Sequence, residues 1–211
     1  MADNLFSNWK TVPNLISFLR ILMVPIFVFL FRNSHIGWAV FVLFLSGLSD
    51  ALDGKIARRF NQTSDLGKVI DPLADKLTQI AIAIMLFIFF RKGDVAEMVW
   101  FSWIFIVFLA KEALMVIVAM VMIGLGLRPG AAEIYGKVAT FVFYGVMLLI
   151  IGFGPQIGAF SKYFTLSTSV MKILIIISAL LTIMAFFSYV PDTVRQFREK
   201  RAREKSFGAK E

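Results

Sequence analysis

Six predominantly apolar stretches, each close to the ~20 residues with which a helix crosses a bilayer, constrain this chain more than any other feature. They cover residues 14–31, 37–59, 67–90, 98–124, 135–153 and 165–189. In hydrocarbon, backbone polar groups must be satisfied within the segment, so such stretches form helices. The chain is also 59% hydrophobic, above the ~45–50% of soluble domains. The sequence therefore predicts an all-α integral membrane protein with six transmembrane helices.

The two ends of the chain flank this membrane domain. Residues 1–11 are mildly amphipathic and predict a short interfacial helix; they lack the basic start and the cleavage site of a signal peptide. Residues 194–211 are strongly basic, which favours contact with anionic membrane lipids. We expect a transmembrane domain at residues 1–193 and a basic cytoplasmic tail at residues 194–211.

The distribution of basic residues predicts the orientation of the helices. Six crossings place both termini on one side, together with the connections after the second and fourth spans. That side receives most of the Lys and Arg residues, which marks it as cytoplasmic. The other side has Arg32, Arg91, Lys92 and Lys162. We expect a multi-pass protein of the cell's inner (plasma) membrane. Its net charge of +8 is explained by membrane topology and by contact with anionic lipids, so we expect no nucleic-acid partner.

Residues 50–75 place four carboxylates where the second span ends and the third begins. Asp50 and Asp53 share one helix face, and Asp71 and Asp75 share another, because their spacings are three and four residues. The short connection makes the two helices antiparallel neighbours, so the carboxylate pairs can face each other. Their repulsion requires a cation between them. Oxygen ligands suit Mg²⁺, Mn²⁺ or Ca²⁺, and a two-metal clamp is a recurrent solution for displacement at phosphorus.

The pattern Asp50-x2-Asp53-Gly54-x2-Ala57-Arg58-x8-Gly67-x3-Asp71-x3-Asp75 resembles the signature of the CDP-alcohol phosphatidyltransferases, with every fixed position filled. The resemblance extends over nearly the whole chain. It implies that an acceptor hydroxyl attacks the β-phosphorus of CDP-diacylglycerol and that CMP leaves. It also implies Mg²⁺ or Mn²⁺ as the cofactor, in the form of two ions, and makes a homodimer plausible.

The same resemblance assigns roles to individual residues. Asp50, Asp53, Asp71 and Asp75 would bind the metal ions, and Asp75 would also accept the proton of the acceptor hydroxyl. The nucleotide-linked lipid would contact Asn14, Ser17, Gly54, Ala57, Arg58, Ser64 and Gly67. Arg58 presents a guanidinium suited to a phosphate oxygen, whereas Asn14 could instead cap the first helix. In a purely structural interpretation the carboxylates pair only with Lys55, Arg58, Arg59, Lys68 and Lys76.

Charged residues inside the spans are the candidates for binding the acceptor. An intramembrane charge is costly unless it is paired or lies in a wet cavity, which also applies to Arg20 in the first span. If Lys111 and Lys137 face one cavity with Arg128, they form a cationic pocket for a phosphorylated alcohol, which favours glycerol 3-phosphate. Alternatively, Lys111 and Glu112 neutralise partners on other helices and Lys137 reaches the interface, as we expect for Lys172.

Residues 11–31 and 71–76 look most like the bacterial phosphatidylglycerophosphate synthases of this family. Two positions depart from that pattern, because Lys111 replaces an expected Arg and Ala139 replaces a second Lys. A cardiolipin synthase of the same family, with phosphatidylglycerol as acceptor, therefore stays open. A divalent-cation transporter is an alternative from another class, although the acids lie near one membrane side and Arg58 has no purpose in a cation pore.

Overall fold

The computed structural model describes residues 11–59, 67–127 and 134–208, with side chains at all of these positions except 13, 51–59, 67–69, 201 and 203–208. Regular structure in this part of the chain is helical throughout. The helices are α1 (Val12–Arg32), α2 (Ile36–Arg59), α3 (Gly67–Arg91), α4 (Ala96–Phe101), α5 (Ile104–Gly124), α6 (Ile134–Phe153) and α7 (Thr168–Gly208). The prediction of an all-α protein is confirmed, and the expected interfacial helix at residues 1–11 lies almost wholly outside the described residues.

Five helical segments are long and apolar enough to cross a membrane. They are Asn14–Arg32, Ile70–Arg91, Ala96–Gly124, Ile134–Phe153 and Thr168–Lys200. The apolar part of α2 is shorter, Ile36–Asp50, because the last turns of this helix contain the charged motif. The protein is thus a multi-pass membrane protein, in which the helix at the predicted second span is apolar over only part of its length.

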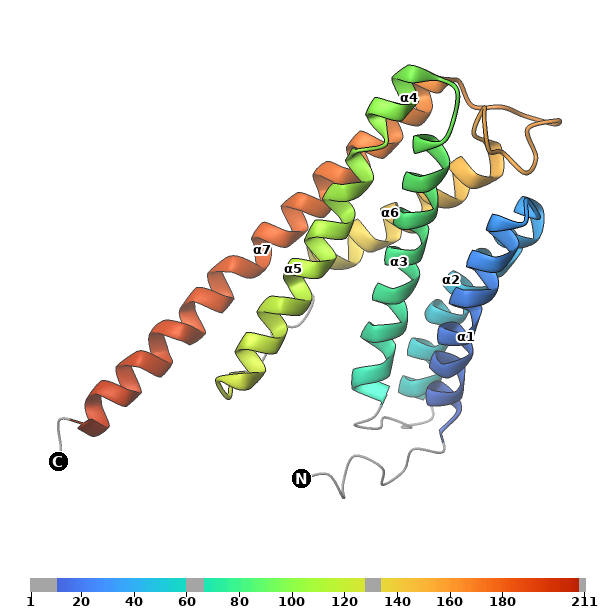
Figure 1. Cartoon of the computed structure of the whole chain (residues 1–211). Coiled ribbons are helices and arrows are strands. Elements are labelled where there is room, and N and C mark those ends of the chain that lie inside the picture. Colours follow the sequence, from blue (N-terminus) through green and yellow to red (C-terminus); the bar gives the residue numbers. More distant parts are fainter. Residues whose placement is uncertain (1–10, 60–66, 128–133, 209–211) are drawn as a thin grey trace.

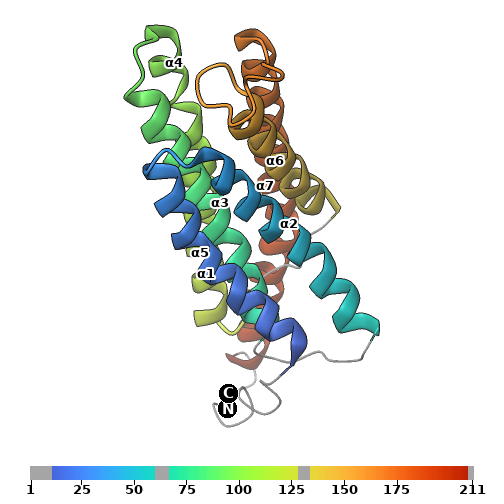
Figure 2. The same cartoon turned by 90° about the vertical axis from the view of Figure 1, so that its right-hand side faces the viewer.

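The helices form a bundle in which α3 packs between α1 and α5. Helix α1 also packs on α2, and α6 packs on α7. The α6–α7 pair joins the rest of the bundle where α2 contacts α6 and where α5 contacts α7. The start of α1, the end of α2, the start of α3 and the ends of α5 and α7 lie at one end of the bundle (Figures 1 and 2). Helix α4 and the connection between α6 and α7 lie at the opposite end. The acidic motif therefore lies at the same end as the start of α1 and the end of α7.

Local sequence signals set several of the helix ends. Thr11 is the N-cap of α1, and its side chain accepts a hydrogen bond from the backbone N–H of Asn14 at 3.4 Å. Helix α5 ends before Gly126, whose φ of +69° is a left-handed conformation that glycine adopts without steric cost. Helix α7 instead continues through Pro191, so the basic segment extends the last span as one helix.

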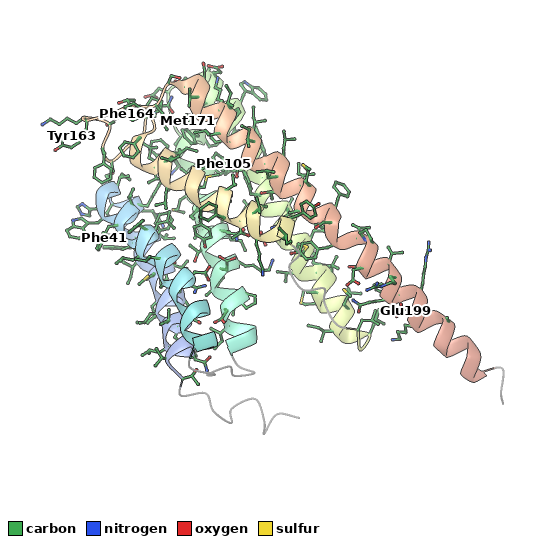
Figure 3. All side chains as sticks on the ribbon, turned by 180° about the vertical axis from the view of Figure 1, so that it is seen from behind. Phe41, Phe105, Tyr163, Phe164, Met171 and Glu199 are labelled. Atoms are coloured by element: carbon green, nitrogen blue, oxygen red, sulfur yellow. The ribbon has the colours of Figure 1, made fainter. Side chains whose placement is uncertain are left out.

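Aromatic side chains form much of the core. The rings of Phe90 and Phe105 stack with centroids 5.9 Å apart, and those of Phe108 and Phe143 meet edge-on at 5.0 Å. These contacts join α3, α5 and α6. Many other large apolar side chains face outward, such as Phe41, which is 50% exposed (Figure 3). Such an outer surface suits contact with lipid, because a soluble monomer rarely exposes contiguous apolar surface of this extent.

Candidate active site

Helix α1 links the two helices that carry the acidic motif. Ser17 and Arg20 are three residues apart and are both fully buried. The Ser17 hydroxyl donates a hydrogen bond to Oδ1 of Asp71 on α3. The Arg20 guanidinium lies 2.6 Å from Oδ1 of Asp50 on α2. One face of α1 therefore holds one carboxylate from each half of the motif.

Arg20 has the partner that an intramembrane charge requires. Burying a guanidinium costs free energy that only a close counter-charge offsets, and the Asp50 carboxylate supplies this charge. The Asp50 side chain remains 54% exposed. The ion pair thus reduces the repulsion among the acids while it leaves Asp50 accessible to a further ligand.

Asp75 lies one turn beyond Asp71 on α3 and is held by two neighbours. The Gln79 amide donates a hydrogen bond to Oδ2 of Asp75 at 3.1 Å. The Tyr144 hydroxyl of α6 donates to the Asp75 backbone carbonyl oxygen at 3.4 Å. Asp75 also interacts electrostatically with Asp50. The structure therefore places Asp75 within electrostatic range of the Asp50 carboxylate on the other motif helix. Among the described residues, α1 packs on both motif helices, and direct facing of the two carboxylate pairs stays a prediction.

The donor chemistry of this region fits a hard divalent cation, because Asp50, Asp71 and Asp75 present carboxylate oxygens around α1. Among the described side chains, however, no three acidic or His residues are close enough together to hold a metal ion by themselves. The fourth predicted ligand, Asp53, lies in the helical part of α2 whose side chains are outside the description. The predicted two-metal site stays a prediction.

Helix α1 also carries Asn14, which is buried one turn before Ser17. The helix-capping interpretation of Asn14 is wrong, because Thr11 is the N-cap. Of the other residues predicted to bind the nucleotide, Gly54, Ala57 and Arg58 lie in the last turns of α2 and Gly67 begins α3, with their side chains outside the description; Ser64 lies wholly outside it.

A second charged cluster lies between α3 and α5. The Lys76 Nζ atom is 2.7 Å from Oε2 of Glu112, and Lys111 contacts Oε1 of the same carboxylate. The purely structural interpretation paired Lys76 with the motif aspartates, but its ion pair is formed with Glu112. The alternative in which Lys111 and Glu112 neutralise partners on other helices is thus confirmed for Glu112 and wrong for Lys111, which pairs with Glu112 of its own helix.

The predicted acceptor pocket is described only in part. Lys111 belongs to the cluster above, and Lys137 is exposed near the start of α6. Arg128 lies outside the described residues. A common cavity for the three therefore stays a prediction. Lys172 forms an ion pair with Glu97 and lies 6.0 Å from the ring centroid of Phe101, so it joins α7 to α4.

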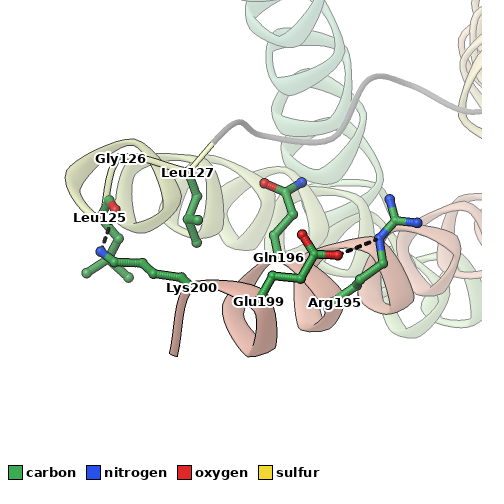
Figure 4. A pocket seen from close by; sticks show the side chains of 7 residues that line it. All are labelled: Leu125, Gly126, Leu127, Arg195, Gln196, Glu199 and Lys200. Atoms are coloured by element: carbon green, nitrogen blue, oxygen red, sulfur yellow. Dashed lines mark hydrogen bonds and ion pairs between the residues drawn. The ribbon is translucent and has the colours of Figure 1, made fainter. Parts of the chain in front are cut away.

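A pocket lies between the end of α5 and the basic part of α7 (Figure 4). It is lined by Leu125, Gly126, Leu127, Arg195, Gln196, Glu199 and Lys200. The Lys200 ammonium donates to the Leu125 carbonyl oxygen at 2.6 Å, which satisfies a carbonyl at the negative end of the α5 dipole. None of these lining residues belongs to the predicted site.

Sequence reasoning missed some of the residues that support the site. The spacing of four residues between Asp75 and Gln79 on one helix could have indicated their contact. Neither the contact of Tyr144 with the Asp75 backbone nor that of Lys76 with Glu112 has such a local signal, because each joins residues on different helices.

Comparisons with known proteins agree on one family. The model of the CDP-alcohol phosphatidyltransferases matches residues 10–190. A cardiolipin synthase (CMP-forming) of Streptomyces coelicolor is 36% identical over 151 residues, which are 68% of this chain and 66% of that protein. A CDP-diacylglycerol-glycerol-3-phosphate 3-phosphatidyltransferase of Aquifex aeolicus is 33% identical over 142 residues, 67% of this chain and 75% of that protein.

A putative cardiolipin synthase of Mycobacterium tuberculosis is 37% identical over 134 residues, which are 63% of this chain and 60% of that protein. The chain thus spans between 60% and 75% of the length of these three relatives.

Proposed function

The chain belongs to the CDP-alcohol phosphatidyltransferase family, and from this premise we propose that it transfers a phosphatidyl group from CDP-diacylglycerol to glycerol 3-phosphate and releases CMP. The observation that carries this proposal is the contact of α1 with both motif helices, through Arg20 with Asp50 and through Ser17 with Asp71. A set of carboxylates held in this way suits a reaction at a pyrophosphate, whose charge must be balanced by cations.

In the proposed reaction the acceptor oxygen bonds to the β-phosphorus of the donor. The bond from that phosphorus to the oxygen that leaves with CMP breaks, and the hydroxyl proton passes to Asp75. Gln79 donates to Oδ2 of Asp75 and so orients this carboxylate. A base must be held within hydrogen-bond reach of the proton that it removes, and we assign this role to Asp75.

The proposed cofactor is Mg²⁺ or Mn²⁺, in the form of two ions, which Asp50, Asp53, Asp71 and Asp75 would hold. When bound, such ions supply charge neutralisation at the pyrophosphate and at the leaving oxygen. The remaining residues of the motif would bind the donor: Arg58 would hold a phosphate, while Gly54, Ala57 and Gly67 leave room for the nucleotide. Asn14, Ser17 and Ser64 would offer polar contacts to it.

Phosphatidylglycerol is the second candidate acceptor, and two observations favour it. The relatives from Streptomyces coelicolor and Mycobacterium tuberculosis carry the names cardiolipin synthase and putative cardiolipin synthase. In addition, Ala139 stands where a second lysine is expected, which removes one contact to the phosphate of a phosphorylated alcohol.

We further propose that the motif faces the cytoplasm from the plasma membrane and that the basic tail contacts anionic lipids. In support, the motif end of the bundle is also where α1 starts and α7 ends (Figure 1). The chain contains 0 cysteines, so single cysteines introduced in the tail and near Lys162 can be labelled in intact cells. Labelling of the tail residue by an impermeant reagent without prior cell lysis would contradict this orientation. The family also suggests a homodimer, which cross-linking would test.

The decisive experiment measures CMP release by the purified full chain in detergent with CDP-diacylglycerol and Mg²⁺. Glycerol 3-phosphate, phosphatidylglycerol or no alcohol is added in parallel reactions. We expect CMP only when an acceptor is present, and no CMP after chelation of the metal. Failure to release CMP with every acceptor tested would refute the proposal. Uptake of Mg²⁺ or Mn²⁺ into proteoliposomes without CMP formation would support a cation transporter instead.

A further inference from the structure

Two ammonium groups from different helices share one buried carboxylate. The Glu112 side chain is only 4% exposed. Its Oε2 atom lies 2.7 Å from Nζ of Lys76 on α3, and its Oε1 atom contacts Nζ of Lys111 on α5. Each carboxylate oxygen therefore holds one lysine, so Glu112 fixes the positions of both ammonium groups relative to each other.

This cluster has more positive charge than its own stability requires. One lysine would neutralise the buried carboxylate, and a buried carboxylate needs such a partner. The second lysine gives the cluster a net charge of about +1. The Lys76 and Lys111 side chains are 29% and 17% exposed, so the positive groups are more accessible than the carboxylate. Because an ammonium has three N–H donors and the contact with Glu112 uses one, each lysine can bind a further acceptor.

The cluster lies within electrostatic range of the proposed base. Lys76 follows Asp75 in the chain, and Glu112 interacts electrostatically with the Asp75 carboxylate. An anion bound by Lys76 and Lys111 would therefore be a neighbour of Asp75. In a glycerol phosphate the hydroxyl and the phosphate are separated by a few bonds, so a phosphate held at the cluster places a hydroxyl within reach of Asp75.

We propose that Lys76 and Lys111 together bind the phosphate of the acceptor alcohol and that Glu112 is the positioning residue that holds both ammonium groups for it. This inference rests on the proposed function and adds Lys76 and Glu112 to the residues that decide acceptor affinity. The two lysines provide charge-assisted hydrogen bonds to phosphate oxygens. Glu112 does not bind the phosphate itself, because its carboxylate and the phosphate are both anionic and repel each other.

The first test compares Michaelis constants for the two substrates in Lys76→Met and Glu112→Gln variants of the full chain. Each variant should raise the KM for glycerol 3-phosphate by about tenfold or more, the size expected for losing a charge-assisted hydrogen bond. The KM for CDP-diacylglycerol should stay within about twofold. Lys76→Met leaves a one-to-one pair of Lys111 with Glu112, so this variant keeps a neutral buried pair and should fold even if Glu112→Gln does not.

A matched control is Lys172→Met, which removes another lysine from an ion pair with a glutamate on a different helix, Glu97. Its KM values for both substrates should equal those of the wild type. A positioning role also predicts that Glu112→Gln has no further effect on acceptor KM in a Lys76→Met/Lys111→Met background. An undiminished effect in that background, or equal changes in both KM values of Lys76→Met, would overturn the inference.

A binding measurement separates this inference from the proposed function. Isothermal titration of the wild type with glycerol 3-phosphate, in the presence of CDP and Mg²⁺ and without lipid, measures acceptor binding whether or not turnover occurs. We expect binding that weakens about tenfold in Lys76→Met and is unchanged in Lys172→Met. Equal affinities in the wild type and Lys76→Met would overturn the inference even if CMP release is observed. Absence of CMP release with lysine-dependent binding would overturn only the proposed function.

Discussion

Arg20 of α1 and Asp50 of α2 form an ion pair of 2.6 Å in which the arginine side chain is 1% exposed and the aspartate side chain is 54% exposed. The arginine is thus a fixed internal counter-charge, while the aspartate retains a face that a ligand can reach. This ion pair offsets the charge of one of the carboxylates that gather at this end of the bundle.

Replacing Arg20 with Met should destabilise the protein. Asp50 would lose its counter-charge, and the expected loss is about 1–3 kcal/mol, below that of a fully buried pair because Asp50 is partly solvated. Thermal unfolding in detergent would measure the change. Arg32→Met, at the exposed end of α1, is the control and should have little effect. Equal melting temperatures of the Arg20 and Arg32 variants would show that the ion pair does not stabilise the bundle.

Replacing Ser17 with Ala should weaken metal binding through Asp71. Ligating carboxylates depend on hydrogen-bond partners for their orientation, and loss of such a partner costs roughly 10–100-fold in metal affinity or activity. The dependence of CMP release on Mg²⁺ concentration would reveal the loss. Ser178→Ala is the matched control, because the buried Ser178 hydroxyl has no hydrogen-bond partner among the described residues. An identical Mg²⁺ dependence in both variants would argue against a role for Ser17.

Replacing Asp75 with Asn should abolish turnover but preserve folding and much of the nucleotide binding, because the amide cannot accept the acceptor's proton. Gln79→Leu should have a smaller effect on kcat, since it removes only the hydrogen bond that orients Asp75. Single-turnover CMP formation, together with binding of CDP measured separately, would distinguish the two steps. Substantial turnover by Asp75→Asn would exclude this residue as the base.

Replacing Lys137 with Ala should raise the KM for a phosphorylated acceptor far more than the KM for CDP-diacylglycerol. Lys137 is exposed near the start of α6, so its ammonium is accessible to an anionic ligand. Steady-state kinetics with each substrate varied in turn would measure both constants. If both constants change by the same factor, Lys137 does not belong to the acceptor pocket.

Helical periodicity and spacing were sufficient to predict much of this protein. Residues 14–31 became most of α1, and residues 135–153 became nearly all of α6, because long apolar runs in a bilayer have few alternatives to the helix. The predicted spans also placed Asp50 in α2 and Asp71 and Asp75 in α3, but it is α1 that packs on both of these helices and contacts Asp50 and Asp71. Even so, the predicted fourth span is divided into α4 and α5, which are separated by Ser102 and Trp103. Apolar periodicity does not predict this break, because it depends on local packing and hydrogen bonding.

The sequence by itself thus determined the helical membrane fold and the position of the acidic motif on two helices that follow each other in the chain, since both depend on residues close together in the chain. Only the tertiary structure decided that Arg20 pairs with Asp50, that Ser17 holds Asp71, and that Lys76 is paired with Glu112. The physical reason is that each buried charge needs a counter-charge, but which partner it finds depends on how helices from distant parts of the chain pack together.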